Sequence, residues 1–359
     1  MQKRILLLIS TALASLSLQG CINLRGSSKI NYSPKPIAMS EVEGWPEDRS
    51  GLSVLTYNIR DLPWPASSGR SKVAIDIGHR LGEMREQDIQ PNIVLLQEAF
   101  RKGAENINRE AKYPHIVYGP DKATKTDTYP ISEEFHNQRS WKKGEKFSKN
   151  LLNSGLALLS DYPIVDVKRV AFPRGMCAGY DCLASKGILI AWIKVPEVDD
   201  PIAFVVIHLN SREPTGVSGE RADEAYYHQV KMLQRVIEKE IDPNTIIVIG
   251  GDLNMGHAPK RLNAVEELLE GFGYENAIRK AYLTEVVPDS SIGHIKGTLE
   301  YHTDVLLVKD TPDKRLAPHN GWVPFPKYIQ EAYSDHPGFI LDLSLIEDEN
   351  NKDIVPILE

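Results

Sequence analysis

Short runs of aliphatic residues recur along the chain after about residue 50, and polar residues, glycine or proline bound each of them. Several runs are continuous rather than alternating, which is typical of strands that are covered on both faces. The pattern predicts strands at 52–58, 92–98, 154–160, 187–195, 202–210, 245–254, 303–310 and 338–346.

Between these runs lie segments with apolar residues at helical spacing, most clearly at 222–241 and 260–273. The polar segment 119–150 predicts a long, mobile surface loop. No internal repeat is visible. One mixed α/β domain over residues 50–347, followed by a polar tail at 348–359, is the simplest organisation.

The N-terminus does not belong to this pattern. Two basic residues precede an apolar segment at 5–18, which is too short for a membrane span and typical of a signal peptide. The segment ends in Leu-Gln-Gly-Cys, which resembles the bacterial lipobox, in which Cys21 becomes the lipidated first residue. The isoleucine that follows favours, by the same resemblance, sorting to the outer membrane of the cell envelope. The alternative is a plain secretory peptide cleaved near Gly20, and in both cases residues 22–49 form a flexible tether.

The other two cysteines, Cys177 and Cys182, are close together in the sequence. In an oxidising compartment they predict a local disulfide, and two free thiols are the alternative. The net charge of −7 argues against nonspecific duplex binding as the main activity, although an enzyme with a local basic groove is compatible with it.

Several of the predicted strands end in a residue that can hold a cation, a phosphate or a proton, or begin next to such a residue. Asparagine, glutamate, histidine and aspartate suit hard-cation and phosphoryl chemistry better than the lysine, threonine or serine that an ordinary exposed end would tolerate. After Gly250 and Gly251 a plainer interpretation is also open, in which the glycines break the strand and a turn follows. The residues are Asn58, Glu98, His208, Asn210, Asp252, Asn254, Asp304, Asp335 and His336.

The motifs that contain these residues resemble, in their order, those of the endonuclease/exonuclease/phosphatase superfamily. They read LTYNIR, VLLQEAF, SGLALLSDYPI, VIHLNS, GGDLNM, TDVLLV and YSDHPGFILDL, and they span about residues 52–345. The resemblance implies a four-layer αββα sandwich of two mostly antiparallel sheets flanked by helices. It also implies hydrolysis of a phosphoester that depends on Mg²⁺ or another divalent cation such as Mn²⁺.

The same resemblance implies a metal site. Glu98 would be the main metal carboxylate, Asn58 would hold the phosphate or a metal-bound water, and Asp335 would lie beside the metal. Mg²⁺ keeps several waters and needs only one or two protein carboxylates, so this sparse set suffices.

The remaining roles concern proton transfer and the phosphoryl group. By resemblance, His336 would take the proton from the attacking water, and Asp304 would orient its ring. Asp252 and Asn254 would position water and phosphoryl oxygens, and His208 would hydrogen-bond the phosphoryl oxygen or assist the leaving group.

Three details resemble bacterial neutral sphingomyelinases: the phenylalanine after Gln-Glu-Ala, the cysteine-containing segment that ends in Lys-Gly, and the segment before Asp-His. In the last of these, Trp322 and Phe325 beside Lys327 would suit a hairpin that contacts a membrane, with buried packing as the alternative. Asn210 joins these two aromatic residues as a predicted substrate contact.

Four functions therefore remain open from the sequence. The first is a phosphodiesterase that acts on a phospholipid headgroup ester, with a lipid anchor in the membrane. The second is an extracellular nuclease, to which the basic residues between 139 and 149 would contribute. The third is a phosphomonoesterase for inositol or sugar phosphates, and the least favoured is a non-catalytic lipoprotein. No obligate protein partner is indicated.

Overall fold

The computed structural model describes residues 51–63, 66–126, 128–147, 150–196, 198–301, 303–326 and 333–347. The predicted signal peptide, lipidation site Cys21, tether and C-terminal tail lie outside these residues, as does Lys327. None of the described helices is long and apolar enough to cross a membrane.

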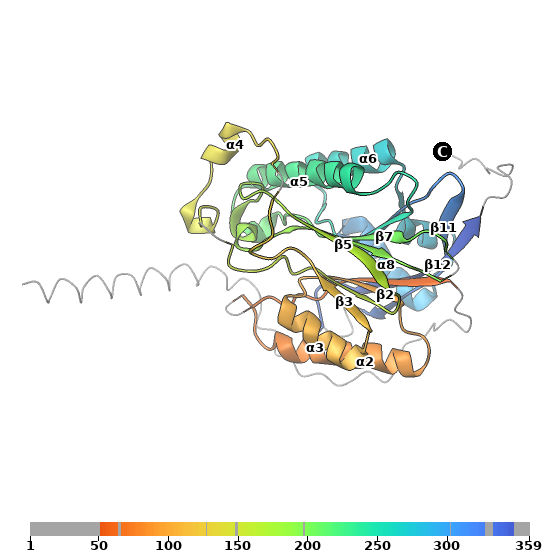
Figure 1. Ribbon diagram of the computed structural model, residues 1–359. Helices are drawn as coiled ribbons and strands as arrows, with labels where there is room; N and C mark the ends of the chain where they lie inside the picture. Colours follow the sequence, from red (N-terminus) through yellow and green to blue (C-terminus); the bar gives the residue numbers. More distant parts are fainter. Residues whose placement is uncertain are drawn as a thin grey trace, which may run out of the picture.

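Two sheets of six strands form the centre of the molecule (Figure 1). The first sheet has the order β11-β12-β1-β2-β4-β3, and the second has the order β5-β6-β7-β8-β10-β9. The strands of the first sheet are β1 (Leu52–Asn58), β2 (Ile93–Gln97), β3 (His115–Tyr118), β4 (Ala157–Ser160), β11 (Lys314–Phe325) and β12 (Gly338–Glu347). Those of the second are β5 (Ile164–Ala171), β6 (Gly187–Ile193), β7 (Ile202–His208), β8 (Ile247–Asp252), β9 (Glu275–Asn276) and β10 (Asp304–Lys309).

Helices cover the outer face of each sheet (Figure 1). Helices α2 (Arg70–Glu86) and α3 (Arg101–Ala111) lie against the first sheet, and α5 (Gly219–Glu240) and α6 (Pro259–Phe272) lie against the second. The shorter elements are α4 (Glu133–Asn137), η2 (Trp141–Lys143), η3 (Gly179–Leu183), η4 (Glu213–Thr215), α7 (Ala277–Leu283) and α8 (Asp289–Tyr301).

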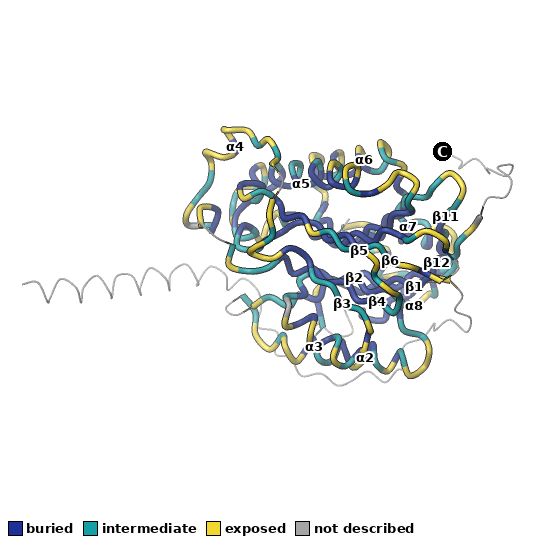
Figure 2. The backbone as a smooth tube through the Cα atoms, viewed as in Figure 1, coloured by how far each residue is buried: buried dark blue, intermediate teal, exposed yellow. Residues whose placement is uncertain are grey.

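Three apolar layers hold this arrangement together. The first lies between the two sheets, where alternate residues such as Val54 and Leu95 meet Phe204 and Val248. The other two lie between each sheet and its helices. Strands with both faces covered need continuous aliphatic runs, which is why the central strands were predictable from the sequence. Figure 2 shows these strands buried and the outer helix faces exposed.

The predicted four-layer sandwich is therefore confirmed. Each sheet contains one parallel pair, β1 with β2 and β7 with β8, and the other neighbours in each sheet are antiparallel.

The predicted membrane contact by Trp322 and Phe325 is wrong. Their exposed fractions are 2% and 1%, and the Phe325 ring stacks on Tyr57 with a centroid distance of 4.9 Å. Both side chains pack in the layer under α2 and α3. Residues three apart in a regular strand face opposite sides, and the register shift between Trp322 and Phe325 in the pairing of β11 with β12 lets these two face the same side. Burial on the helix side therefore replaces the exposed tip.

The prediction for residues 119–150 is wrong in part. The segment contains α4 and η2, and its Phe135 and Glu145 are buried, with exposed fractions of 3% and 1%. Glu145 forms an ion pair with Arg221 of α5 at 2.6 Å, so a buried charge attaches this polar segment to the second sheet's helix layer.

Candidate active site

The ends of strands from both sheets meet at one edge of the sandwich. Asn58 and Gln97 are paired at the ends of the parallel strands β1 and β2, and His208 and Asp252 are paired at the ends of β7 and β8. The antiparallel strand β10 begins at the same edge, because its first residue, Asp304, is paired with Asp252. Parallel strands place their carboxyl ends together, so the polar residues predicted at strand ends converge.

Two glycines of β8 permit close packing in two directions. A Cβ atom at Gly250 would lie 2.3 Å from Leu95 Cδ1 of the first sheet, so this glycine lets the two sheets approach. A Cβ atom at Gly251 would lie 1.9 Å from the Ile207 carbonyl oxygen of β7, the neighbouring strand in the same sheet. Strand β8 continues through both residues to Asp252, so the glycines serve close packing and do not break the strand.

Asn58 joins the two halves of the site. Its side-chain amide donates to Asp252 Oδ2 at 3.0 Å and to Glu98 Oε1 at 3.3 Å. The side chain is fully buried, and its Oδ1 accepts from the Arg60 backbone N–H at 3.1 Å. One amide therefore fixes the separation of two carboxylates that come from different sheets.

Glu98 has the properties of a cation ligand. Its φ is +49°, a conformation that costs a non-glycine residue energy and persists where the surroundings enforce it. Within the described part of the chain, its buried Oε2 has no hydrogen-bond partner. Burial raises the pKa of Glu98 to about 7, although the charge of His336 opposes the shift and that of Asp335 adds to it. A buried carboxylate oxygen without a partner suits a hard cation.

His336 lies between two carboxylates. Its Nδ1 is 2.8 Å from Asp304 Oδ2, and its Nε2 is 3.7 Å from Asp252 Oδ2. Burial alone would lower the pKa of His336, but Asp304 and Asp252 outweigh burial and raise it well above its usual range. Asp252, Asp304 and His336 each offer one atom within 4.8 Å of the others, a grouping that could hold a metal ion.

His208 has the opposite protonation preference. Its exposed fraction is 6%, and its Nε2 is 3.7 Å from Asp252 Oδ2. Burial lowers the pKa of His208 well below its usual range, and the charges of Lys186 and His336 lower it further. The two histidines therefore flank one carboxylate with different charge states.

Burial also raises the pKa of Asp252 to about 6, against the opposing charge of His336. Asp252 Oδ1 accepts from the backbone N–H of Asn254 at 2.9 Å, which is the local turn that the plainer interpretation of the sequence expected. The turn and the site therefore use the same carboxylate.

The other predicted residues differ in how close they lie to the site. Asp335 lies at the rim with its side chain 46% exposed, and its Oδ2 is 3.2 Å from Arg60 Nη1. Asn254 lies beside the site with φ of +50°, and its side-chain amide donates to the Leu209 carbonyl oxygen. The prediction that Asn210 contacts substrate is not supported: the residue is fully buried, its Oδ1 accepts from Ala178 N–H, and its amide donates to the Ser211 carbonyl oxygen.

Sequence reasoning missed Lys186 and Ser334. Lys186 Nζ donates to Asp181 Oδ2 and to the Leu209 carbonyl oxygen, both at 2.8 Å, and its charge acts on Glu98 and His208. Ser334 Oγ donates to the Asn58 carbonyl oxygen at 2.6 Å and accepts from His336 N–H at 3.2 Å. Both residues precede strands that run antiparallel to a neighbour, and such a strand begins at the edge where its neighbour ends. A polar residue just before a predicted strand was therefore the signal that could have found them.

The predicted disulfide between Cys177 and Cys182 is confirmed. It closes the loop around η3, which carries Asp181, the partner of Lys186. The disulfide therefore stabilises one wall of the site through an ion pair.

Comparison with known proteins gives matches of two kinds. The chain is 28% identical over 199 residues to sphingomyelinase C from Listeria ivanovii, a region that covers 53% of this chain and 54% of that protein. The match thus spans about half the length of this relative. A search against protein-family models finds none that matches.

Solved structures agree with the fold. A beta toxin variant from Staphylococcus aureus with bound magnesium ions superposes with a TM-score of 0.54 at 18% identity, covering 82% of this chain and 99% of the other. An endonuclease/exonuclease/phosphatase protein from Beutenbergia cavernae gives 0.51 at 19% identity, covering 83% and 72%. The protein therefore has the fold of the endonuclease/exonuclease/phosphatase proteins, and its sequence is similar to that of a sphingomyelinase C.

Proposed function

We propose that the protein is a divalent-cation-dependent phosphodiesterase that cleaves a phospholipid headgroup ester on the lipid side of the phosphate, as a phospholipase C does. The observation that carries this proposal is the arrangement of Glu98 and Asp252 around Asn58, with the His336–Asp304 pair against Asp252. Buried carboxylates beside an oriented histidine suit water activation next to a cation.

His336 is the proposed general base. It accepts a proton from the water that attacks phosphorus, and Asp304, 2.8 Å away, stabilises the imidazolium that results. Burial lowers the pKa of His336, but the charges of Asp304 and Asp252 outweigh burial and raise it. The ring is therefore neutral at ordinary pH only when part of that carboxylate charge is compensated. A divalent cation held by Glu98 would supply such compensation.

Glu98 is the proposed main cation ligand, with Asn58 and Asp252 beside it. A divalent cation there would polarise the phosphoryl oxygens and compensate the charge of the carboxylates. The fit rests on Glu98 Oε2, a buried oxygen with no hydrogen-bond partner in the described chain.

His208 and Lys186 are proposed to stabilise the phosphoryl group. Burial lowers the pKa of His208 and favours the neutral ring, which keeps one N–H that can donate a hydrogen bond to a phosphoryl oxygen. Lys186 adds a positive charge that acts on both His208 and Glu98. As the phosphorus–oxygen bond to the lipid breaks, the departing oxygen takes a proton from water, and His336 releases the proton it accepted to solvent, which balances the step.

The choice of a phospholipid rests on sequence similarity to a sphingomyelinase C, a relative that supports sphingomyelin as the first substrate to test. A nuclease is the second candidate, because proteins with this fold are not limited to lipid substrates and the described Lys143 and Lys146 lie in a basic segment.

The experiment gives the chain from residue 22 sphingomyelin, phosphatidylcholine and DNA in parallel, with Mg²⁺ and with excess chelator. We expect phospholipid hydrolysis with Mg²⁺ and none with chelator. Hydrolysis of DNA alone would support the nuclease, and hydrolysis in chelator would contradict the cation requirement.

We also propose that lipid on Cys21 holds the protein in the bacterial cell envelope. The support is the Leu-Gln-Gly-Cys motif after an apolar segment. Replacing Cys21 with Ser should prevent incorporation of a labelled fatty acid into the protein while leaving turnover of a soluble phosphodiester unchanged. Incorporation of the label into the Cys21→Ser protein would contradict lipidation at Cys21.

A further inference from the structure

Two exposed aromatic side chains lie together in the segment after α4, and an exposed leucine follows them in the chain. Trp141, Phe147 and Leu151 have exposed fractions of 65%, 44% and 48%, and the rings of Trp141 and Phe147 meet edge to face with centroids 6.4 Å apart. Other large exposed hydrophobic residues of the described chain belong to other elements, such as Val165 in β5 and Leu283 at the end of α7. Clustered exposed aromatic residues mark an interaction surface more often than scattered ones do.

The same segment is strongly basic. Residues 139–151 contain five basic residues and one acidic residue, Glu145, although the whole chain carries a net charge of −7. Glu145 does not reduce the positive charge at the surface, because it is buried and paired with Arg221 at 2.6 Å. Lys146 is exposed, and Lys143 lies over the Tyr180 ring at 5.5 Å. The segment therefore presents aromatic rings together with positive charge.

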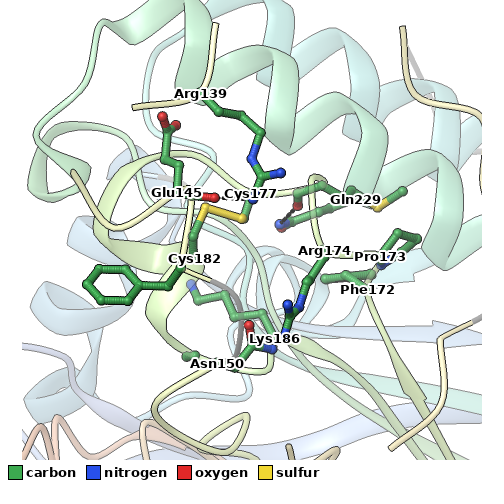
Figure 3. Close-up of a pocket in the computed structure, with 13 residues that line it drawn as sticks. Arg139, Glu145, Asn150, Phe172, Pro173, Arg174, Cys177, Cys182, Lys186 and Gln229 are labelled. Atoms are coloured by element: carbon green, nitrogen blue, oxygen red, sulfur yellow. Dashed lines mark hydrogen bonds between the residues drawn. A yellow bond between two sulfur atoms is a disulfide. The ribbon is translucent and has the colours of Figure 1, made fainter. Parts of the chain in front are cut away.

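The segment is held firmly against the disulfide loop. Glu145 accepts hydrogen bonds from the backbone N–H groups of Ser140 and Gly179, at 2.5 and 3.0 Å. Asn150 donates to Ser185 Oγ at 3.0 Å, and Leu151 N–H donates to the Leu183 carbonyl oxygen at 2.7 Å. Figure 3 shows Arg139, Glu145 and Asn150 grouped around the Cys177–Cys182 disulfide, with Lys186 beside Asn150.

The attachment also brings this surface next to the candidate active site. Ser185 is followed by Lys186, whose charge acts on Glu98 and His208. Four residues after Leu151, Gly155 approaches Glu98 so closely that an added Cβ would lie 3.3 Å from Glu98 Cα. Residues that follow or bind this segment therefore also lie next to Glu98, the proposed cation ligand.

We propose that the described residues 139–147 and 150–151 form a docking surface for an anionic phospholipid bilayer and hold the active-site edge against the lipid headgroups. This inference rests on the proposed function. Aromatic rings flanked by lysines suit the headgroup region, where the rings lie in the interface and the lysines meet anionic lipid. A single-stranded nucleic acid would also use rings and lysines, but it is usually bound along a groove. Here α4 and the segment after it, both yellow in Figure 1, project from the body of the molecule.

The test measures binding to vesicles of phosphatidylcholine with and without phosphatidylglycerol, using the chain from residue 22, which retains every described element. Replacing Trp141 and Phe147 together with Ala should weaken binding to the mixed vesicles by about tenfold or more. The matched control replaces Val165 and Leu283 with Ala, since both are similarly exposed. It should bind as the parent protein does.

A charge variant and a substrate comparison complete the test. Lys146→Glu should weaken binding only when phosphatidylglycerol is present, and added salt should remove the difference. Turnover of a soluble phosphodiester should be unchanged in these variants, because none of them alters Glu98 or His336, while turnover of vesicle lipid should fall with binding.

The outcomes separate this inference from the proposed function. Unchanged vesicle binding in the Trp141 and Phe147 variant, or an equal loss in the control, would overturn the docking surface even if the enzyme cleaves lipid. Loss of single-stranded DNA binding without loss of vesicle binding would assign the surface to nucleic acid. Normal docking with no lipid hydrolysis would leave the surface intact and reject the proposed function.

Discussion

The pair formed by His336 and Asp304 gives the sharpest prediction. Asp304 is 3% exposed, and its Oδ2 lies 2.8 Å from His336 Nδ1 and 3.0 Å from Thr303 Oγ1. Replacing Asp304 with Asn keeps the size of the side chain but removes the charge that favours the imidazolium. A hydrogen bond to a charged group contributes about 1.5–3 kcal/mol, which corresponds to a loss in turnover of roughly 10- to 150-fold.

The same substitution should move the pH dependence in a defined direction. Asp304 is the first of the charges that raise the pKa of His336 against burial, so its removal lowers that pKa. The acidic limb of the turnover profile should shift to lower pH even as the maximum rate falls. A purely structural role for Asp304 would reduce the amount of folded enzyme and leave the profile in place.

The assay is turnover of a soluble phosphodiester, which avoids any effect of membrane binding. His336→Ala should lower turnover by about 10²-fold or more, the usual effect of removing a general base. The double variant should be no slower than His336→Ala alone, because Asp304 acts through the ring. Losses that simply add in the double variant would refute the coupled base.

The remaining predictions concern the cation, a buried charge and the aromatic residues of β11. Glu98→Gln should abolish turnover, and in the parent protein added Mg²⁺ should raise Tm more at about pH 8 than at about pH 5.5. Burial raises the pKa of Glu98 from 4.5 to about 7, so the metal-free fold loses stability as pH rises through that window. The carboxylate that ionises over the same window is the form that binds the cation. An equal rise in Tm at both pH values would contradict this. Glu145→Gln should lower the free energy of unfolding by about 3–5 kcal/mol, because it leaves Arg221 buried without its charged partner. Glu267, whose side chain is 58% exposed, gives the control: Glu267→Gln should change the free energy of unfolding by less than about 1 kcal/mol. Similar losses for the two variants in a denaturant titration would refute the buried pair. Trp322→Ala should cost about 3–5 kcal/mol of stability and leave vesicle binding per folded molecule unchanged, and the opposite result would return this residue to the surface.

The sequence was most informative where a strand is covered on both faces. Strands β1, β2, β7 and β8 are buried at every residue and contain runs of aliphatic side chains, as strands covered on both faces do. Strand β5 was missed because it lies at the end of its sheet and two polar residues, Asp166 and Arg169, are exposed in it. Strand β11 was missed because it contains prolines at positions 318 and 324, which usually argue against a strand, and tolerates them at the edge of its sheet.

The site followed the same logic. Polar residues at the ends of buried strands predicted Asn58, Glu98, His208 and Asp252, since parallel neighbours place those ends together. Lys186 was outside this reasoning because it precedes its strand, and only the antiparallel pairing of β6 with β7 brings it to the site.

Side-chain direction and long-range pairing were beyond the sequence. The orientation of Phe325 accompanies a register shift in the pairing of β11 with β12, which composition does not show. The partner of Glu145 lies 76 residues away, so nothing near Glu145 in the chain indicates that this charge is buried. Asn210 resembles its neighbours at strand ends, yet its amide is used within the protein.

The most direct test of the central claim follows phosphorus by NMR while the chain from residue 22 acts on sphingomyelin vesicles with Mg²⁺. Cleavage on the lipid side of the phosphate predicts a new phosphomonoester signal from phosphocholine, which should be absent with chelator and in the Glu98→Gln protein. The account would be contradicted if the lipid phosphorus signal stayed unchanged while His336-dependent hydrolysis of DNA continued, or if the phosphate remained on the lipid and free choline appeared.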